Sequence, residues 1–180
     1  MRPINPGEFR TADLELTPDD GMRYELVDGV LLVTPTSSAI HQRALQALSR
    51  HMVPACPDHL EVFFGPLEFR PDSRLALLPD LLAVPCQDNG TRWVEELLLA
   101  VEILAPATLT VDEVLKRKLY EDAGVRSYWM FDPQQARLTV LELENGSYVE
   151  RALVSGDEVF EAELPSPVKV VPADLIHSGG

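Results

Sequence analysis

Basic residues, cysteines and long apolar runs are all scarce in this sequence of 180 residues. Only 15 Lys and Arg face 29 Asp and Glu, so the formal net charge is −14. This balance argues against a protein that grips nucleic acid across a broad basic surface. It permits a narrow site in which a cation screens a few carboxylates, so buried acids are the candidate functional residues.

The scarcity of cysteine and of apolar runs also restricts where the protein works. Cys56 and Cys86 are the two cysteines, and their spacing is not that of a metal site. A disulfide framework is therefore not expected, and a reducing compartment fits. No segment approaches the roughly 18 consecutive apolar residues of a membrane span, and residues 1–10 lack the apolar core of a signal peptide. We expect a cytoplasmic protein without membrane segments.

Length and patterning predict one domain over residues 1–180, large enough for a sizeable core. Asp28-Gly29 and Asn145-Gly146 each separate two β-rich runs, which is the strongest short signal for a hairpin. Further strands are expected at 60–69, 75–84, 97–104, 127–131 and 159–164. Residues 1–16 suggest an extended lead-in, 17–20 a helix start or a turn, and 85–91 a polar loop. The fold class is α/β (α+β), with a mixed sheet and two main helices.

Both expected helices show an apolar stripe. In residues 39–53 the stripe comprises Ile40, Ala44, Leu45, Leu48 and Met52, with Ser37 or Ser38 as the cap. In residues 110–123, a rotation of 100° per residue gives a buried stripe of Val111, Leu115 and Leu119. Gly124 is a natural stop for the second helix.

Two acids are placed where acids are costly. Glu102 lies near the end of the apolar run 97–104, and Asp80 interrupts the run 75–84 after Pro79. Carboxylates at the ends of neighbouring strands can converge, and such a pair needs a proton, a lysine or a metal ion. Mg²⁺ prefers oxygen ligands of this kind and acidifies a bound water. The alternative is that Asp80 caps a turn and Glu102 forms an ordinary salt bridge.

The helix at 110–123 offers two lysines on opposite edges of its stripe. Lys116 shares one edge with Asp112, and Lys118 lies on the other edge. Helical geometry alone does not choose between them. Asp112 and Lys116 are also spaced as an i,i+4 pair, which on a solvated face contributes about 0.2–0.5 kcal/mol and requires no function.

Several of these motifs occur together and in a recognisable order. They are 24–29 (YELVDG), Pro79-Asp80, 101–108 (VEILAPAT), Asp112, Lys116, Tyr120, Gly124-Val125, Tyr128-Trp129 and Asp132-Pro133. Over roughly residues 17–170 the chain resembles a family of small bacterial proteins, formerly a domain of unknown function, described as putative restriction endonucleases. That family is a branch of the PD-(D/E)XK nuclease superfamily.

The resemblance implies a restriction-endonuclease-like core that hydrolyses phosphodiester bonds of nucleic acid, with DNA as the expected substrate. It assigns Asp80, Glu102 and the Ile103 carbonyl as ligands of Mg²⁺, for which Mn²⁺ can substitute. It adds Glu25 as an extra metal ligand or a residue that holds the water. It also selects Lys116 as the catalytic lysine, because Leu104 stands where the superfamily motif has its lysine.

The chain departs from that family where Ala105 and Ala107 replace serines. Together with the acidic composition, this keeps open a binding or assembly module that retains the fold without useful turnover. A glycosidase is disfavoured, because aromatic residues make up only 7% of the chain. His41 matches the family pattern but is interpreted as a partly exposed helix residue.

Two further expectations concern stability and assembly. We expect alanine at Asp80 or Glu102 to abolish cleavage and to raise stability, because in this interpretation only a metal ion offsets their charge. A homodimer is expected because symmetric homodimers are the commonest soluble oligomers.

Overall fold

The computed structural model describes residues 7–86, 90 and 92–176. The strands are β1 (Met22–Val27), β2 (Val30–Pro35), β3 (Leu60–Phe64), β4 (Glu68–Asp72), β5 (Leu75–Leu77), β6 (Leu81–Pro85), β7 (Trp93–Val94), β8 (Leu99–Ile103), β9 (Ser127–Asp132), β10 (Arg137–Glu144), β11 (Ser147–Ser155), β12 (Phe160–Ala162) and β13 (Val168–Val170). The helices are the 3₁₀ helix η1 (Thr11–Leu16), α1 (Ala39–Met52), the π-helix η2 (Val111–Lys116), α2 (Arg117–Asp122) and the 3₁₀ helix η3 (Pro172–Leu175).

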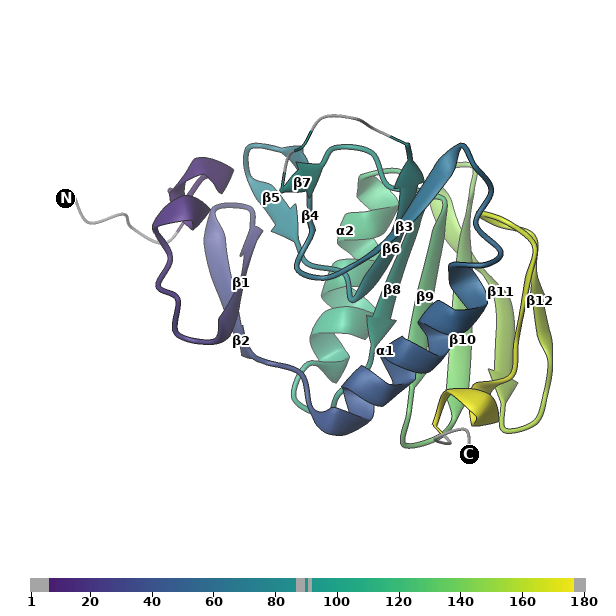
Figure 1. Cartoon of the computed structure of the whole chain (residues 1–180). Coiled ribbons are helices and arrows are strands. Elements are labelled where there is room, and N and C mark those ends of the chain that lie inside the picture. The colour runs from purple at the N-terminus through teal and green to yellow at the C-terminus, as the bar shows by residue number, and fades with distance from the viewer. Residues whose placement is uncertain (1–6, 87–89, 91, 177–180) are drawn as a thin grey trace.

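A six-stranded mixed sheet is the centre of the molecule, with the order β11-β10-β9-β8-β6-β3. Its strands pair antiparallel except for β8 and β9, which run parallel. A second sheet of five strands, β2-β1-β5-β4-β7, lies beside it towards the N-terminus (Figure 1). Strands β12 and β13 form a separate pair. The expected mixed α and β architecture is therefore present.

Strand β8 is buried throughout because helices cover both faces of the central sheet (Figure 1). Leu99, Val101 and Ile103 pack with α1 on one face, whereas Ala100 and Leu104 pack with α2 on the other. Alternation along a strand therefore puts Glu102 on the face of η2 and α2. No helix in the described ranges is both long and apolar enough to cross a membrane.

Both predicted hairpins are present. Asp28 and Gly29 have φ values of 47° and 80°, and Asn145 and Gly146 have 52° and 83°. Positive φ at both central residues is the type I′ geometry that matches the twist of paired strands, and Asn-Gly and Asp-Gly favour it.

Other boundaries differ from the sequence prediction. The run 60–69 divides into β3 and β4, and η1 replaces part of the extended lead-in, while no helix begins at 17–20. Residues 1–6 of that lead-in, and 87–89 and 91 of the predicted loop, lie outside the described residues, as do 177–180 at the end of the predicted domain.

The helix after β8 is rotated relative to the prediction. Asp112, Lys116 and Tyr120 are buried, whereas Leu115 is 38% exposed; Val111 and Leu119 are only half-buried. The prediction assumed α-helical rotation, but η2 is a π-helix with wider turns. Lys116 and Tyr120 face inward because they contact buried carboxylates, and a stripe of apolar residues does not predict such polar contacts.

Candidate active site

Strand register brings Asp80 and Glu102 together. Leu81 pairs with Val101 in the antiparallel ladder between β6 and β8, so the next position sets Asp80 opposite Glu102. The Asp80 amide donates to the Val101 carbonyl at 3.0 Å, which extends this register to the residue before β6 begins. Both carboxylates are buried and line one cavity of about 150 Å³, together with Glu25, Ile103 and Lys116.

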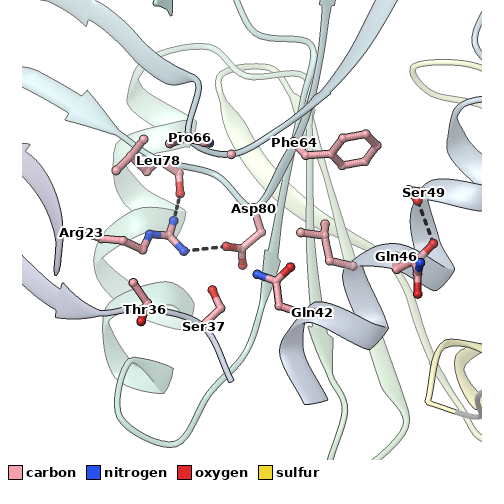
Figure 2. Close-up of a pocket in the computed structure, with 12 residues that line it drawn as sticks. Arg23, Thr36, Ser37, Gln42, Gln46, Ser49, Phe64, Pro66, Leu78 and Asp80 are labelled. Atoms are coloured by element: carbon pink, nitrogen blue, oxygen red, sulfur yellow. Dashed lines mark hydrogen bonds and ion pairs between the residues drawn. The ribbon is translucent and has the colours of Figure 1, made fainter. Parts of the chain in front are cut away.

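The Asp80 carboxylate is held by three donors. Arg23 donates from Nη1 to Oδ1 at 2.7 Å, and Figure 2 shows this contact. His41 Nε2 lies 2.8 Å from Oδ2, and the Ile103 amide donates to Oδ2 at 2.8 Å. Burial opposes ionisation, but the hydrogen bond from His41 and the charge of Arg23 outweigh it and lower the pKa of Asp80. Asp80 is therefore an anion.

Lys116 lies among three other carboxylates. Its Nζ is 3.0 Å from Glu25 Oε1, 3.0 Å from Glu102 Oε1 and 3.5 Å from Asp112 Oδ1. Burial disfavours the ammonium, yet Glu102, Glu25 and Asp112 together raise the pKa of Lys116. Lys116 is a permanent cation here, so the solvated i,i+4 face considered from the sequence is wrong.

Helix α2 completes the surroundings of Glu102. The hydroxyl of the fully buried Tyr120 donates to Glu102 Oε1 at 2.9 Å. Burial nevertheless raises the pKa of Glu102 well above its ordinary range, although the positive charge of Lys116 opposes that rise. Lys118, by contrast, is an exposed residue that pairs with Glu121 and Asp122. Of the two lysines, Lys116 is the one at this site.

The charges do not balance within the protein. Four carboxylates, Glu25, Asp80, Glu102 and Asp112, face two permanent cations, Arg23 and Lys116, so ionisation of all four would leave two excess negative charges. Burial accordingly raises the pKa of Asp112 as well. A buried excess of this size favours either proton uptake or one divalent cation.

The donor chemistry fits Mg²⁺. A carboxylate offers about four lone-pair sites; Asp80 uses three and Glu102 uses two in the contacts above, so both retain capacity. Within 7–86, 90 and 92–176, no three His, Cys, Asp or Glu side chains form a group that could hold a metal ion. Mg²⁺ needs no such cage, since it commonly takes one or two carboxylates and keeps several waters.

Ala105 and Ala107 line the same cavity, so the two serine hydroxyls that this chain lacks would have been at the site. Other hydroxyls line it as well, from Ser37, Ser38 and Thr108. The Thr108 hydroxyl donates to Asp112 Oδ2 at 2.8 Å, and Ser38 caps α1 by accepting from the His41 amide at 3.3 Å.

Comparison with known proteins identifies the family. The model of the Uma2 family, described as "Putative restriction endonuclease", matches residues 10–171. This chain belongs to the Uma2 family. Among curated proteins no match was found.

The Uma2 assignment agrees with the fold. A crystal structure of a putative nuclease belonging to DUF820 from Anabaena variabilis ATCC 29413 superposes with a TM-score of 0.66. The two chains share 16% sequence identity, and the match covers 93% of this chain and 97% of the other. At that identity the likeness establishes a common fold.

Sequence reasoning about this Uma2 protein missed two residues of the site. Arg23 lies two positions before Glu25 on β1 and so points to the same face, a signal that strand alternation could have provided. His41 is only 7% exposed, whereas Ile40, which was predicted to be buried, is 56% exposed. His41 continues the buried series of Ala44, Leu48 and Met52, and its unsuspected partner is Asp80.

The structure also overturns the expected gain in stability on removal of either acid. That expectation assumed that only a metal ion offsets the charges. Arg23 and His41 already pair with Asp80, and Lys116 and Tyr120 pair with Glu102. Removing one partner of a buried pair leaves the other buried and unpaired, which is strongly destabilising.

Proposed function

We propose that this protein is a Mg²⁺-dependent endonuclease that hydrolyses phosphodiester bonds of nucleic acid, with DNA as the first substrate to test. The observation that supports this best is that Asp80, Glu102 and Lys116 line one small cavity in which carboxylates outnumber the permanent cations. Membership in the Uma2 family supports the same reaction class.

In this proposal Asp80, Glu102 and the Ile103 carbonyl hold the ion. When bound, Mg²⁺ supplies an acidified water and screens the negative charge of the phosphate. Glu25 fixes Lys116 at 3.0 Å and accepts from the Leu78 amide at 2.8 Å, so it positions the lysine.

Lys116 supplies positive charge for the pentacoordinate phosphate. Because its carboxylate neighbours raise the pKa of Lys116, it remains protonated and is unsuited to deprotonate the attacking water. Of the two roles open to this lysine, charge stabilisation is therefore the one that we propose.

Nicking of supercoiled plasmid DNA tests the proposal. Purified wild-type protein should nick with Mg²⁺ or Mn²⁺ and not with EDTA, and Asp80→Asn should be inactive. Lys116→Gln should lose about 10²–10³-fold, the usual loss when one group that stabilises the transition state is removed. Lys118→Gln is the matched control and should behave as wild type. Mg²⁺-dependent nicking by pure Asp80→Asn at the wild-type rate would refute the proposal.

A second candidate is a binding or assembly module that has lost turnover. It is favoured because Asp80 and Glu102 already form ion pairs with Arg23 and Lys116, which neutralise them without a metal ion. Titration calorimetry with Mn²⁺ separates the two candidates when it is combined with cleavage assays on single-stranded, duplex and branched DNA. Metal binding without cleavage of any substrate would support the module. A homodimer remains a prediction, and light scattering after gel filtration tests it.

A further inference from the structure

A larger cavity of about 450 Å³ adjoins the candidate active site (Figure 2). We call it the Phe64 pocket. It shares the lining residues Arg23 and Asp80 with the smaller cavity, along with Thr36 and Ser37. A ligand in the Phe64 pocket would therefore lie directly beside the place where the proposed function puts the reacting phosphate.

The walls of the Phe64 pocket combine an aromatic ring with free amides. Phe64, at the end of β3, lines the pocket and is 40% exposed, so part of its side chain is accessible to a ligand. Gln42 and Gln46 are exposed one turn apart on α1, and Figure 2 shows them across the pocket from Phe64. Neither side-chain amide hydrogen-bonds another residue in the described part of the chain.

This chemistry suits a nucleobase better than a phosphate. An amide both donates and accepts, as the edges of bases do, and an aromatic ring stacks on any base. Among the described residues of the lining, Arg23 is the one cation, and it already pairs with Asp80. A pocket that binds through stacking and amides also needs no basic surface, which accords with the net charge of −14.

The size and position of the pocket restrict the ligand further. A volume of about 450 Å³ falls within the range of small-ligand sites, about 300–1,000 Å³. A base inside a duplex has both faces covered by its neighbours, so it must unstack before it can lie against a side chain.

We propose that the Phe64 pocket binds one unstacked nucleobase next to the scissile phosphate, so that the enzyme prefers single-stranded or locally opened nucleic acid. This inference rests on the proposed nuclease function. Phe64 stacks on the base, and Gln42 and Gln46 contact its edge.

Binding in EDTA tests the pocket without requiring catalysis. The probe is a short oligothymidylate that carries one 2-aminopurine, whose fluorescence falls when the base stacks on an aromatic ring. Phe64→Ala should weaken binding about 5- to 140-fold, the equivalent of one stacked base, and should abolish the quenching. Phe64→Tyr should restore both, whereas Phe64→Leu should restore neither. Leu153→Ala, an exposed apolar residue on β11, is the control.

Cleavage assays then distinguish the two proposals. If wild-type protein cuts single strands faster than duplex, and Phe64→Leu loses that preference, the inference holds. If wild-type and Phe64→Leu proteins cut both substrates equally, the inference fails and the nuclease function stands. If nothing is cut, the nuclease function fails, and the fluorescence assay alone tests the Phe64 pocket. Quenching that depends on Phe64 would then support a base-binding site, and the absence of such quenching would overturn it.

Discussion

Lys116→Met removes an ammonium group that contacts three carboxylates, and its effect can be estimated from the structure. The Lys116 side chain is 4% exposed, and its partners Glu25, Glu102 and Asp112 are equally buried. Removing one partner of such a buried network costs about 3–5 kcal/mol, because the remaining charges are left unpaired. For a chain of this length, the melting temperature should fall by about 6–20 °C.

Lys118→Met is the matched comparison, only two residues away. The Lys118 side chain is 63% exposed, and exposed ion pairs contribute at most about 1 kcal/mol. Both variants lose one lysine from the same helical region and gain the same side chain. The difference between their unfolding free energies therefore isolates burial.

The cost of Lys116→Met should also depend on pH. Its neighbours raise the pKa of Lys116, so in the wild type the lysine stays charged from about pH 5 to 8 and its contribution is constant. In the variant, Glu102 and Asp112, whose pKa values burial raises, take up protons as the pH falls. The destabilisation should therefore shrink towards low pH.

Urea unfolding of both variants at about pH 5 and pH 8, monitored by circular dichroism, measures these effects. Adding Glu102→Gln to Lys116→Met should recover part of the loss, since it removes one unpaired charge. Equal losses for the two lysine variants at pH 8 would show that Lys116 is not the buried cation of the site.

Four further outcomes are expected. Because burial raises the pKa of Glu102 and Mg²⁺ requires the ionised carboxylate, calorimetric Mg²⁺ binding should tighten as the pH rises, and Glu102→Gln should weaken that dependence. Without metal, burial raises the pKa of Glu102 in the native state above that in the unfolded chain, so stability should fall as the pH rises through the range between the two pKa values. Tyr120→Phe, which deletes a 2.9 Å hydrogen bond to Glu102, should cost about 1.5–3 kcal/mol by urea unfolding; an unchanged midpoint would contradict that bond. Gly29→Ala should destabilise more than Gly146→Ala, and thermal unfolding measures the difference. Both glycines have φ near 80°, but a Cβ at Gly29 would clash with the Gly7 carbonyl oxygen, whereas no described residue beyond its chain neighbours has an atom within 4 Å of a Cβ at Gly146.

Local signals were sufficient for much of the fold. The two Asx-Gly turns and the buried run at 97–104 depend on neighbours in sequence, and they appear as expected. The convergence of Asp80 and Glu102 also followed, because a buried acid at a strand end needs a partner.

The failures arose where distant residues decide the outcome. The rotation of η2 depends on Glu25 and Glu102, which attract Lys116 from other strands. The burial of His41 depends on Asp80, 39 residues away. Periodicity reports the average environment of a helix, so it cannot show that a polar residue has a specific partner.

The position of Lys116 has a structural consequence for assembly of the molecule. Glu25 belongs to the five-stranded sheet and Glu102 to the six-stranded sheet, so a single ammonium group links the two. The full set of contacts to Lys116 therefore requires both sheets to be docked. Separation of the two sheets would pull Glu25 away from Lys116 and expose carboxylates that repel one another, so the proposed activity should be lost when the sheets come apart.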